Sequence, residues 1–241
     1  MIKGIYQTAA SMIPREKLQE VIANNLANSE TAGFKKDSIF LRMVQTQQSP
    51  QSKTTPAWEV RMIDKVYTDY TEGSLENTNR ELDLAIQGEG FFAVQTANGE
   101  AYTRNGALTI SPSGQLVNSD NLPILTDGGP ITVQGGQLTV GTSGQVSIDN
   151  QVIGTLKIVD FDKPYQLNKV SGSLYSAPTG VAPNPATSAI VRQGYLEKSN
   201  VDVLREMVDM IDSYRAFETG QRMIQLQDES LGKAVNELGK V

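Results

Sequence analysis

The C-terminal stretch constrains the fold of this chain more than any other part of the sequence. Apolar residues recur there at intervals of seven, as Val203, Met210, Phe217, Ile224, Leu231 and Leu238, and no proline follows Pro185. Such a repeat is typical of long helices that pack along a seam. Residues 200–238 would form a helix about 58 Å long, longer than a single-domain core. We therefore expect the seam to pack on another helix of the chain or on other copies of it.

The N-terminal stretch predicts the other helix. Between residues 2 and 28 the apolar positions are spaced by three and four, as Ile2, Ile5, Ala9, Met12, Leu18, Val21, Ile22 and Leu26. Pro14 predicts a kink or a restart, because proline lacks a backbone donor, and Gly33 is the expected stop. Ser199 is the expected N-cap of the C-terminal helix, with Asp202 completing an acidic capping box. An internal helix pair without a role in assembly stays open as an alternative.

The middle of the chain predicts short strands separated by glycine, asparagine, aspartate and proline. The expected strands cover residues 82–87, 91–96, 108–110, 116–118, 131–133, 138–140, 146–148 and 154–161. Residues 108–116 (LTISPSGQL) align with residues 138–146 (LTVGTSGQV). Each copy has the pattern of a strand, a Ser-Gly turn and a second strand, so we expect two similar hairpins. The predicted fold class is α+β, with terminal helices packed as a coiled-coil stem and a central, mostly antiparallel β domain.

The composition excludes several classes of function. The chain has 241 residues, a net charge of −6, and neither histidine nor cysteine. Ser-His and Cys-His catalysis and His/Cys zinc sites are therefore excluded, and the acidic charge argues against a nucleic-acid partner. No stretch approaches the roughly 20 apolar residues of a membrane span, so we expect no direct membrane insertion. The first residues lack the pattern of a cleaved signal peptide.

Three motifs could carry chemistry, and each has a simpler structural interpretation. Residues 88–93 (GEGFFA) fit a loose dinucleotide pattern, but a strand rather than the required helix is expected next. Asp160 and Asp162 are interpreted as turn carboxylates, because a calcium loop or a glycosidase needs more oxygen ligands or a second carboxylate set by the fold. Arg104 could bind an anion, although a structural ion pair is favoured. We expect no catalytic, cofactor or metal site.

One stretch resembles the signature of flagellar rod and hook proteins, which has the form N-N-L-A-N, a short spacer, then T-x-G-F/Y-K. Here it covers residues 22–36 (IANNLANSETAGFKK). Residues 82–92 (LDLAIQGEGFF) with 102–104 (YTR) and 113–117 (SGQLV) are similar to the β core of this family. Residues 193–201 (QGYLEKSNV), 206–211 (EMVDMI) and 215–218 (RAFE) are similar to its C-terminal region. The resemblance covers nearly the whole chain.

This resemblance implies a structural subunit of the basal-body rod, not an enzyme. In the family, the terminal helices form an inner tube around an export channel and the β domain forms an outer layer. Members leave the cell uncleaved through the flagellar type III export apparatus and polymerise with themselves and other rod subunits in the periplasm. On this basis the chain divides into an N-terminal helix with the motif (1–36), an extended connector (37–80), a central β domain (81–190) and the C-terminal helix (191–241).

The resemblance also suggests which residues act. The expected assembly interface comprises the apolar repeat from Val203 to Leu238 together with Asn24, Asn25, Leu26, Asn28, Gly33 and Phe34. Family export substrates have a short apolar N-terminus and a phenylalanine followed four residues later by an apolar residue. Ile2 and Ile5, then Phe40 and Val44, fit these two export handles.

Alternatives remain open within and outside the family. Because residues 38–66 are compact and no large insert is present, the proximal-rod type is favoured over a distal-rod or hook subunit. A different class, a secreted module that binds or hydrolyses cell-wall glycan, needs converging carboxylates and aromatic platforms. The chain has one tryptophan, Trp58, and 6% aromatic residues, which does not favour that class.

Overall fold

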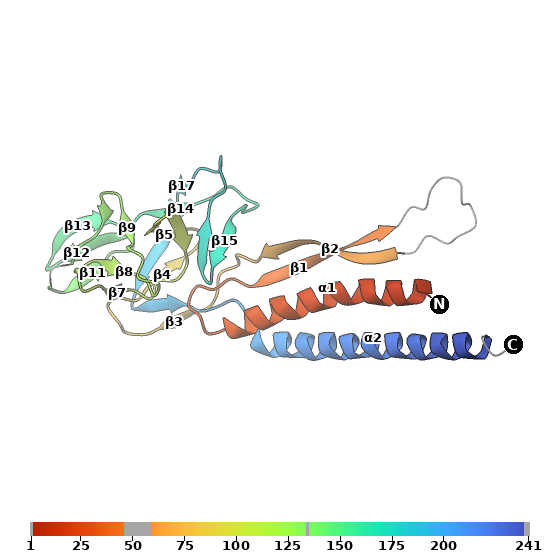
Figure 1. The fold of residues 1–241 in the computed structure, drawn as a ribbon. Coiled ribbons are helices and arrows are strands. Elements are labelled where there is room, and N and C mark those ends of the chain that lie inside the picture. The colour runs from red at the N-terminus through yellow and green to blue at the C-terminus, as the bar shows by residue number, and fades with distance from the viewer. Residues whose placement is uncertain (1, 46–58, 134, 239–241) are drawn as a thin grey trace. The chain divides into compact units, whose positions relative to one another are not determined.

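In the computed structural model, which describes residues 2–45, 59–133 and 135–238, the chain divides into two units (Figure 1). The helical unit comprises Met1–Ala27, Lys36–Asp69 and Val201–Val241. The β unit comprises Asn28–Lys35 and Tyr70–Asn200. The predicted α+β class, with helices at both ends and an antiparallel β domain between them, is confirmed. No helix in the described ranges is long and apolar enough to cross a membrane.

The helical unit is built from two long helices and one two-stranded ribbon. Helix α1 (Ile2–Ala27) and helix α2 (Val203–Leu238) run antiparallel. Near one end the Oγ of Ser213 donates to the Arg15 carbonyl at 3.4 Å, and further along Gly220 lies against the side chain of Met12. Strands β1 (Asp37–Gln45) and β2 (Glu59–Thr68) pair antiparallel, with a register shift between Phe40 and Leu41.

Two details of the helices narrow or correct the sequence-based expectation, and a kink at Pro14 stays a prediction. Helix α1 is continuous through Pro14 and does not restart there. Helix α2 begins at Val203, and the carboxylate of Asp202 accepts a hydrogen bond from the Arg205 amide at 3.2 Å. The N-cap is therefore Asp202 and not Ser199, because the capping oxygen must reach the amides of the first turn.

Among its described residues, the β unit holds short strands that pair only antiparallel. Its main sheet has the order β15-β16-β6-β5-β14-β17. These strands are β5 (Phe91–Thr96), β6 (Gly99–Thr103), β14 (Ile158–Asp160), β15 (Asn168–Ser171), β16 (Leu174–Ser176) and β17 (Asn184–Pro185). Smaller sheets are formed by β3 (Leu75–Asn77) with β19 (Tyr195–Glu197), β4 (Leu84–Gln87) with β18 (Ile190–Gln193), and β9 (Leu125–Thr126) with β10 (Gly129–Pro130).

The predicted internal repeat is confirmed as two hairpins with the same register. Strands β7 (Thr109–Ile110) and β8 (Leu116–Val117) pair Ile110 with Leu116. Strands β11 (Leu138–Val140) and β12 (Gln145–Ile148) pair the equivalent Val140 with Val146. Gly114 and Gly144 occupy equivalent turn positions with φ of +79° and +81°, a region that glycine enters without steric cost.

Two other strand predictions were inaccurate. Residues 131–133 form no strand and are joined to their neighbours by an isolated bridge between Gln115 and Thr132. The run expected over 154–161 is two strands, β13 (Gln151–Thr155) and β14. Strand β13 pairs with β12 and strand β14 joins the main sheet beside β5, so one continuous strand could not serve both.

Two apolar clusters fill the β unit. The larger includes Ile86, Phe92, Leu116, Ile124 and Val146, none of them measurably exposed. The smaller is aromatic, and Phe91, Tyr102, Phe161 and Tyr175 pack there with Tyr70 and Tyr165 in edge or tilted contacts. Interiors of this kind are densely packed. Both clusters consist of residues of the β unit, which therefore has a core of its own.

Candidate assembly site

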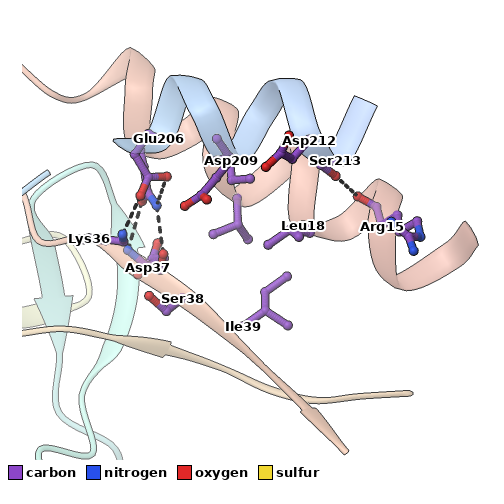
Figure 2. Close-up of a pocket in the computed structure, with 13 residues that line it drawn as sticks. Arg15, Leu18, Lys36, Asp37, Ser38, Ile39, Glu206, Asp209, Asp212 and Ser213 are labelled. Atoms are coloured by element: carbon purple, nitrogen blue, oxygen red, sulfur yellow. Dashed lines mark hydrogen bonds and ion pairs between the residues drawn. The ribbon is translucent and has the colours of Figure 1, made fainter. Parts of the chain in front are cut away.

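Asn25 of the N-terminal motif is a buried junction inside the helical unit. Its side-chain amide donates to the Asp37 carbonyl at 2.8 Å and accepts from the Asp37 amide at 2.9 Å. The same amide nitrogen donates to Glu206 at 3.2 Å, and Glu206 forms an ion pair with Lys36 at 2.5 Å (Figure 2). Asn25 thus ties the end of α1 to the start of β1 and to the first turn of α2.

The neighbouring motif residues are less buried. Asn24 is exposed, and Leu26 and Asn28 are half-buried. The side-chain oxygen of Asn28 accepts from the Thr31 hydroxyl at 3.2 Å, and its carbonyl accepts from the Thr31 amide at 3.1 Å. These bonds form the turn that follows α1, as expected where an asparagine replaces helical hydrogen bonds.

Gly33 and Phe34 lie inside the β unit. Gly33 has φ of +66°, and a Cβ added there would lie 2.3 Å from the carbonyl carbon of Arg104. No side chain therefore fits at this position. Phe34 is fully buried, and the ammonium of Lys169 lies 3.9 Å from the centre of its ring, within the range of a cation–π contact.

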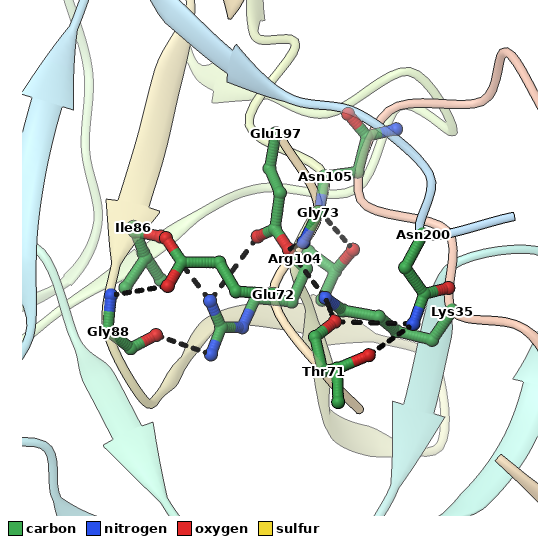
Figure 3. Close-up of polar contacts among 11 residues, drawn as sticks. Lys35, Thr71, Glu72, Gly73, Ile86, Gly88, Arg104, Asn105, Glu197 and Asn200 are labelled. Atoms are coloured by element: carbon green, nitrogen blue, oxygen red, sulfur yellow. Dashed lines mark hydrogen bonds and ion pairs between the residues drawn. The ribbon is translucent and has the colours of Figure 1, made fainter. Parts of the chain in front are cut away.

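Glu197 is the centre of a buried ion cluster that the sequence analysis did not predict (Figure 3). Its carboxylate accepts from Lys35 at 2.5 Å, from the Gly73 amide at 2.9 Å and from Arg104 at 3.3 Å. Lys35 also donates to the Thr71 carbonyl at 2.6 Å. The three charged side chains are at most 4% exposed. The cluster joins the end of β19 to three other segments of the β unit.

The cluster carries two positive charges and one negative charge. Two cations share one carboxylate. The two terminal nitrogens of Arg104 also donate to backbone carbonyls, at 2.8 Å to Gly88 and 3.4 Å to Ile86. Burial lowers the pKa of Lys35, and the charge of Glu197 partly opposes this shift. The interpretation of Arg104 as a structural ion-pair residue is confirmed. The available signal for the rest was a charged residue within each family-like stretch, Lys35 in residues 22–36 and Glu197 in residues 193–201.

The apolar repeat of α2 does not lie at the centre of the contact with α1. Met210, Phe217, Ile224 and Leu231 are half-buried, and Val203 is 41% exposed; the side chain of Leu238 is outside the described residues. The central column lies three residues after each of these and is polar or small: Glu206, Ser213, Gly220, Gln227 and Ala234. A Cβ at Gly220 would approach Met12 to 3.1 Å. Small residues allow close approach of the helix axes, which moves the apolar column to one side.

The first three turns of α2 expose a continuous set of apolar side chains. Leu204, Met207, Val208, Ile211 and Tyr214 are 74%, 48%, 51%, 50% and 63% exposed. They are spaced by three and four residues and therefore share one side of the helix. We call this set the α2 apolar face. Exposed apolar surface of this extent is typical of an interaction site.

The expected export handles lie mostly outside the described side chains. Those of Ile2, Ile5 and Val44 are not described. Phe40 is on β1 and is 57% exposed. It therefore packs only in part against the rest of the helical unit.

The motifs that could have carried chemistry have structural partners. After Gly88 and Gly90 the chain continues as β5 and not as a helix, as predicted. Asp160 accepts from the Tyr165 hydroxyl at 2.9 Å, and Asp162 accepts from the Asn184 amide at 3.0 Å. Among the described residues no group of three or more histidine, cysteine, aspartate or glutamate side chains could hold a metal ion.

Comparison with known proteins identifies the family. Three family models match, described as "Flagella basal body rod protein" (residues 12–35), "Flagellar hook protein FlgE/F/G D1 domain" (85–148) and "Flagellar basal body rod FlgEFG protein C-terminal" (192–237). The chain is 36% identical to the flagellar basal-body rod protein FlgF of Caulobacter vibrioides, with both chains covered completely. It is 31% identical to FlgG of Bacillus subtilis, over 98% of this chain and 99% of that one. It is also 31% identical to FlgF of Rhizobium meliloti, over 99% of each. The chain belongs to the flagellar basal-body rod protein family, a family of structural proteins and not of enzymes, and is most like FlgF.

Proposed function

We propose that this chain polymerises helically in the periplasmic part of the flagellar rod, where it forms part of the drive shaft and of the wall of the export channel. The single observation that carries the proposal is the α2 apolar face, which no part of the helical unit covers among the described residues. Burying a large aliphatic side chain stabilises an assembly by about 1.5–3 kcal/mol. In the polymer, α1 and α2 would pack with those of other subunits as a coiled-coil stem.

The proposed partners are other copies of the chain and other rod subunits. The assembly surface includes the α2 apolar face and the half-buried repeat that contains Met210 and Phe217. The exposed Asn24 would lie at its edge. The buried motif residues Asn25, Gly33 and Phe34 would act indirectly, by holding the surfaces of their units in shape.

A strain that lacks this chain tests the function directly. Complementation with the natural chain should restore rods, seen by electron microscopy of isolated basal bodies, and swimming. A chain with both Ile211→Asp and Tyr214→Asp should restore neither, because a buried unpaired charge strongly opposes association. Val170→Asp is the matched control, since Val170 is 63% exposed but lies in the β unit. Complete rods in the deletion strain would contradict the function, and complete rods in the double variant would contradict the role of the α2 apolar face.

The flagellar type III export apparatus is the other proposed partner. Ile2 and Ile5, then Phe40 and Val44, would be short apolar handles that are read while the chain is unfolded. Phe40→Ala with Val44→Ala should block secretion while the protein accumulates in the cell pellet. Ile190→Ala is the control, because Ile190 is a 44% exposed apolar residue of β18. Normal secretion of the double variant would remove Phe40 and Val44 from the proposal.

A further inference from the structure

A groove opens inside the helical unit between the two helices and the ribbon. It has a volume of about 430 Å³. Leu18 and Val21 of α1 and Ile39 of β1 supply apolar walls, and Asp209 and Asp212 lie along α2 (Figure 2). Glu206 also lines the groove, but its carboxylate is already held by Lys36 and Asn25.

The two aspartates give the α2 side of the groove its charge. Asp209 and Asp212 are exposed, and neither forms an ion pair with another described residue. Arg15 is the other cation that lines the groove besides Lys36. Asp37 and Glu206 also line the groove, so four carboxylates stand against two cations. The groove therefore has an excess of negative charge and apolar walls. It is suited to an apolar side chain accompanied by a cation.

Exposed ribbon residues that do not line the groove carry the complementary chemistry. Tyr67 pairs with Ser38, and Lys65 pairs with Phe40. Directly paired residues of antiparallel strands lie on the same side, and Arg42, two residues after Phe40, shares that side. We call Phe40, Arg42, Lys65 and Tyr67 the ribbon outer face. Its two aromatic rings are 57% and 50% exposed, and its two cations are also exposed.

The ribbon outer face of a chain does not lie in that chain's own groove. Ser38 and Ile39 of β1 line the groove, whereas none of the four residues of the ribbon outer face does. Phe40 and Lys65 are exposed elsewhere on the ribbon. The occupant that the chemistry favours must come from another molecule.

We propose that the ribbon outer face of one copy docks in the groove of a second copy of this chain. Tyr67 and Phe40 would contact the apolar walls, and Lys65 and Arg42 would lie near Asp209 and Asp212. Because the two surfaces differ, the contact is heterologous, and repeated contacts of this kind generate an open filament when the rotation does not close a ring. This proposal rests on the proposed assembly into a rod and names one of the contacts that would build it.

The absence of cysteine from the natural chain allows a direct test. The sole copy in the cell would carry both Tyr67→Cys and Asp212→Cys, and isolated basal bodies would be oxidised and immunoblotted. We expect a ladder of disulfide-linked dimers and larger multimers, because each chain would link to the next. Lys65→Cys with Asp209→Cys is a second pair, which should behave alike if the first pair assembles poorly. Asp120→Cys with Asp212→Cys is the control, since Asp120 is an exposed residue of the β unit.

Three outcomes would overturn the docking proposal: no linked species from either pair, a fast-migrating monomer that indicates an internal link, or a ladder of equal yield from the control.

A charge exchange gives an independent check. With the Lys65→Cys/Asp209→Cys pair present, Asp212→Lys should lower the yield of multimers at least about tenfold, because it places like charges together. Adding Arg42→Asp should restore most of it, and failure to do so would also count against the contact. Rods that assemble without these links would refute only this contact and leave the proposed function standing.

Discussion

The two units of this chain bury their side chains in opposite ways. In the β unit the large apolar residues are inside, and even the charged Lys35, Arg104 and Glu197 are enclosed and paired. In the helical unit the centre of the helix contact is polar or small, and the large apolar residues of α2 are half-buried or exposed. The β unit is therefore complete within one chain, whereas the helical unit leaves apolar side chains exposed, which we propose that neighbours cover.

The ion cluster provides the most severe test of the claim that the β unit is complete within one chain. Glu197→Gln leaves Lys35 and Arg104 buried without an anion, so we expect the free energy of unfolding to fall by about 3–5 kcal/mol. Urea titration followed by circular dichroism measures the change. Glu76→Gln is the matched control: Glu76 pairs with Lys198 at 3.0 Å, but both side chains are more than half exposed, and the cost should stay below about 1 kcal/mol. Equal effects of the two substitutions would show that the cluster does not stabilise the unit.

The same substitution in both units compares their cores. Ile86→Ala in the β unit should lower the free energy of unfolding by about 2–5 kcal/mol, because Ile86 is fully buried. Ile211→Ala on α2 should change the stability of the monomer by less than about 1 kcal/mol, because Ile211 is half exposed. It should nevertheless reduce rod assembly in cells. A large loss of monomer stability for Ile211→Ala would mean that α2 is already covered within one chain.

Gly33 tests how tightly the motif is enclosed by the β unit. Gly172→Ala should cost about 1–2 kcal/mol, the price of a left-handed conformation alone, since Gly172 has φ of +43° and open space around it. Gly33→Ala should cost at least twice as much as Gly172→Ala, because the added methyl group would also meet the backbone of Arg104 and Asn105. Thermal unfolding of the two variants measures the difference. Equal melting temperatures would indicate that the backbone near Arg104 moves to make room for the added methyl group.

The smallest expected effect is a pH dependence of the β unit. Burial and the hydrogen bond to Asp160 raise the pKa of Tyr165 above its usual value near 10. The unfolded chain therefore loses this proton first, and stability should fall as the pH rises above about 10. Tyr165→Phe should make the decline between pH 10 and 12 less steep. Burial also raises the pKa of Tyr102, so part of the decline should remain; an unchanged slope would contradict the role of Tyr165.

The sequence predicted the periodic elements of the fold well. The terminal helices followed from apolar spacing, and the two hairpins followed from the repeat between residues 108–116 and 138–146. The sequence left open which column of α2 faces α1, because a seven-residue repeat fixes a period but not the column that meets a given partner. Glu206 and Gly220 occupy the column that contacts α1, and neither is apolar, so the apolar repeat does not identify them.

The candidate site was predictable only in part. The motif pointed to Asn25 and Gly33, but not to their partners, Glu206 and the Arg104 backbone, which are distant in sequence. Glu197 was missed for the same reason: a buried charge is recognised by its partners, and Lys35 lies far from it along the chain. Contacts between distant segments are set by the tertiary fold, which local periodicity does not specify.

The path of the chain between its two units has a mechanical consequence. The boundaries fall after Ala27, Lys35, Asp69 and Asn200, so the backbone passes from one unit to the other four times. A unit that is joined to the rest of the chain by one segment could rotate freely about that segment. Here, rotating one unit against the other would twist four chain segments around one another, so the covalent chain itself opposes the rotation. In the drive shaft that we propose, these four crossings would oppose twisting of one unit against the other.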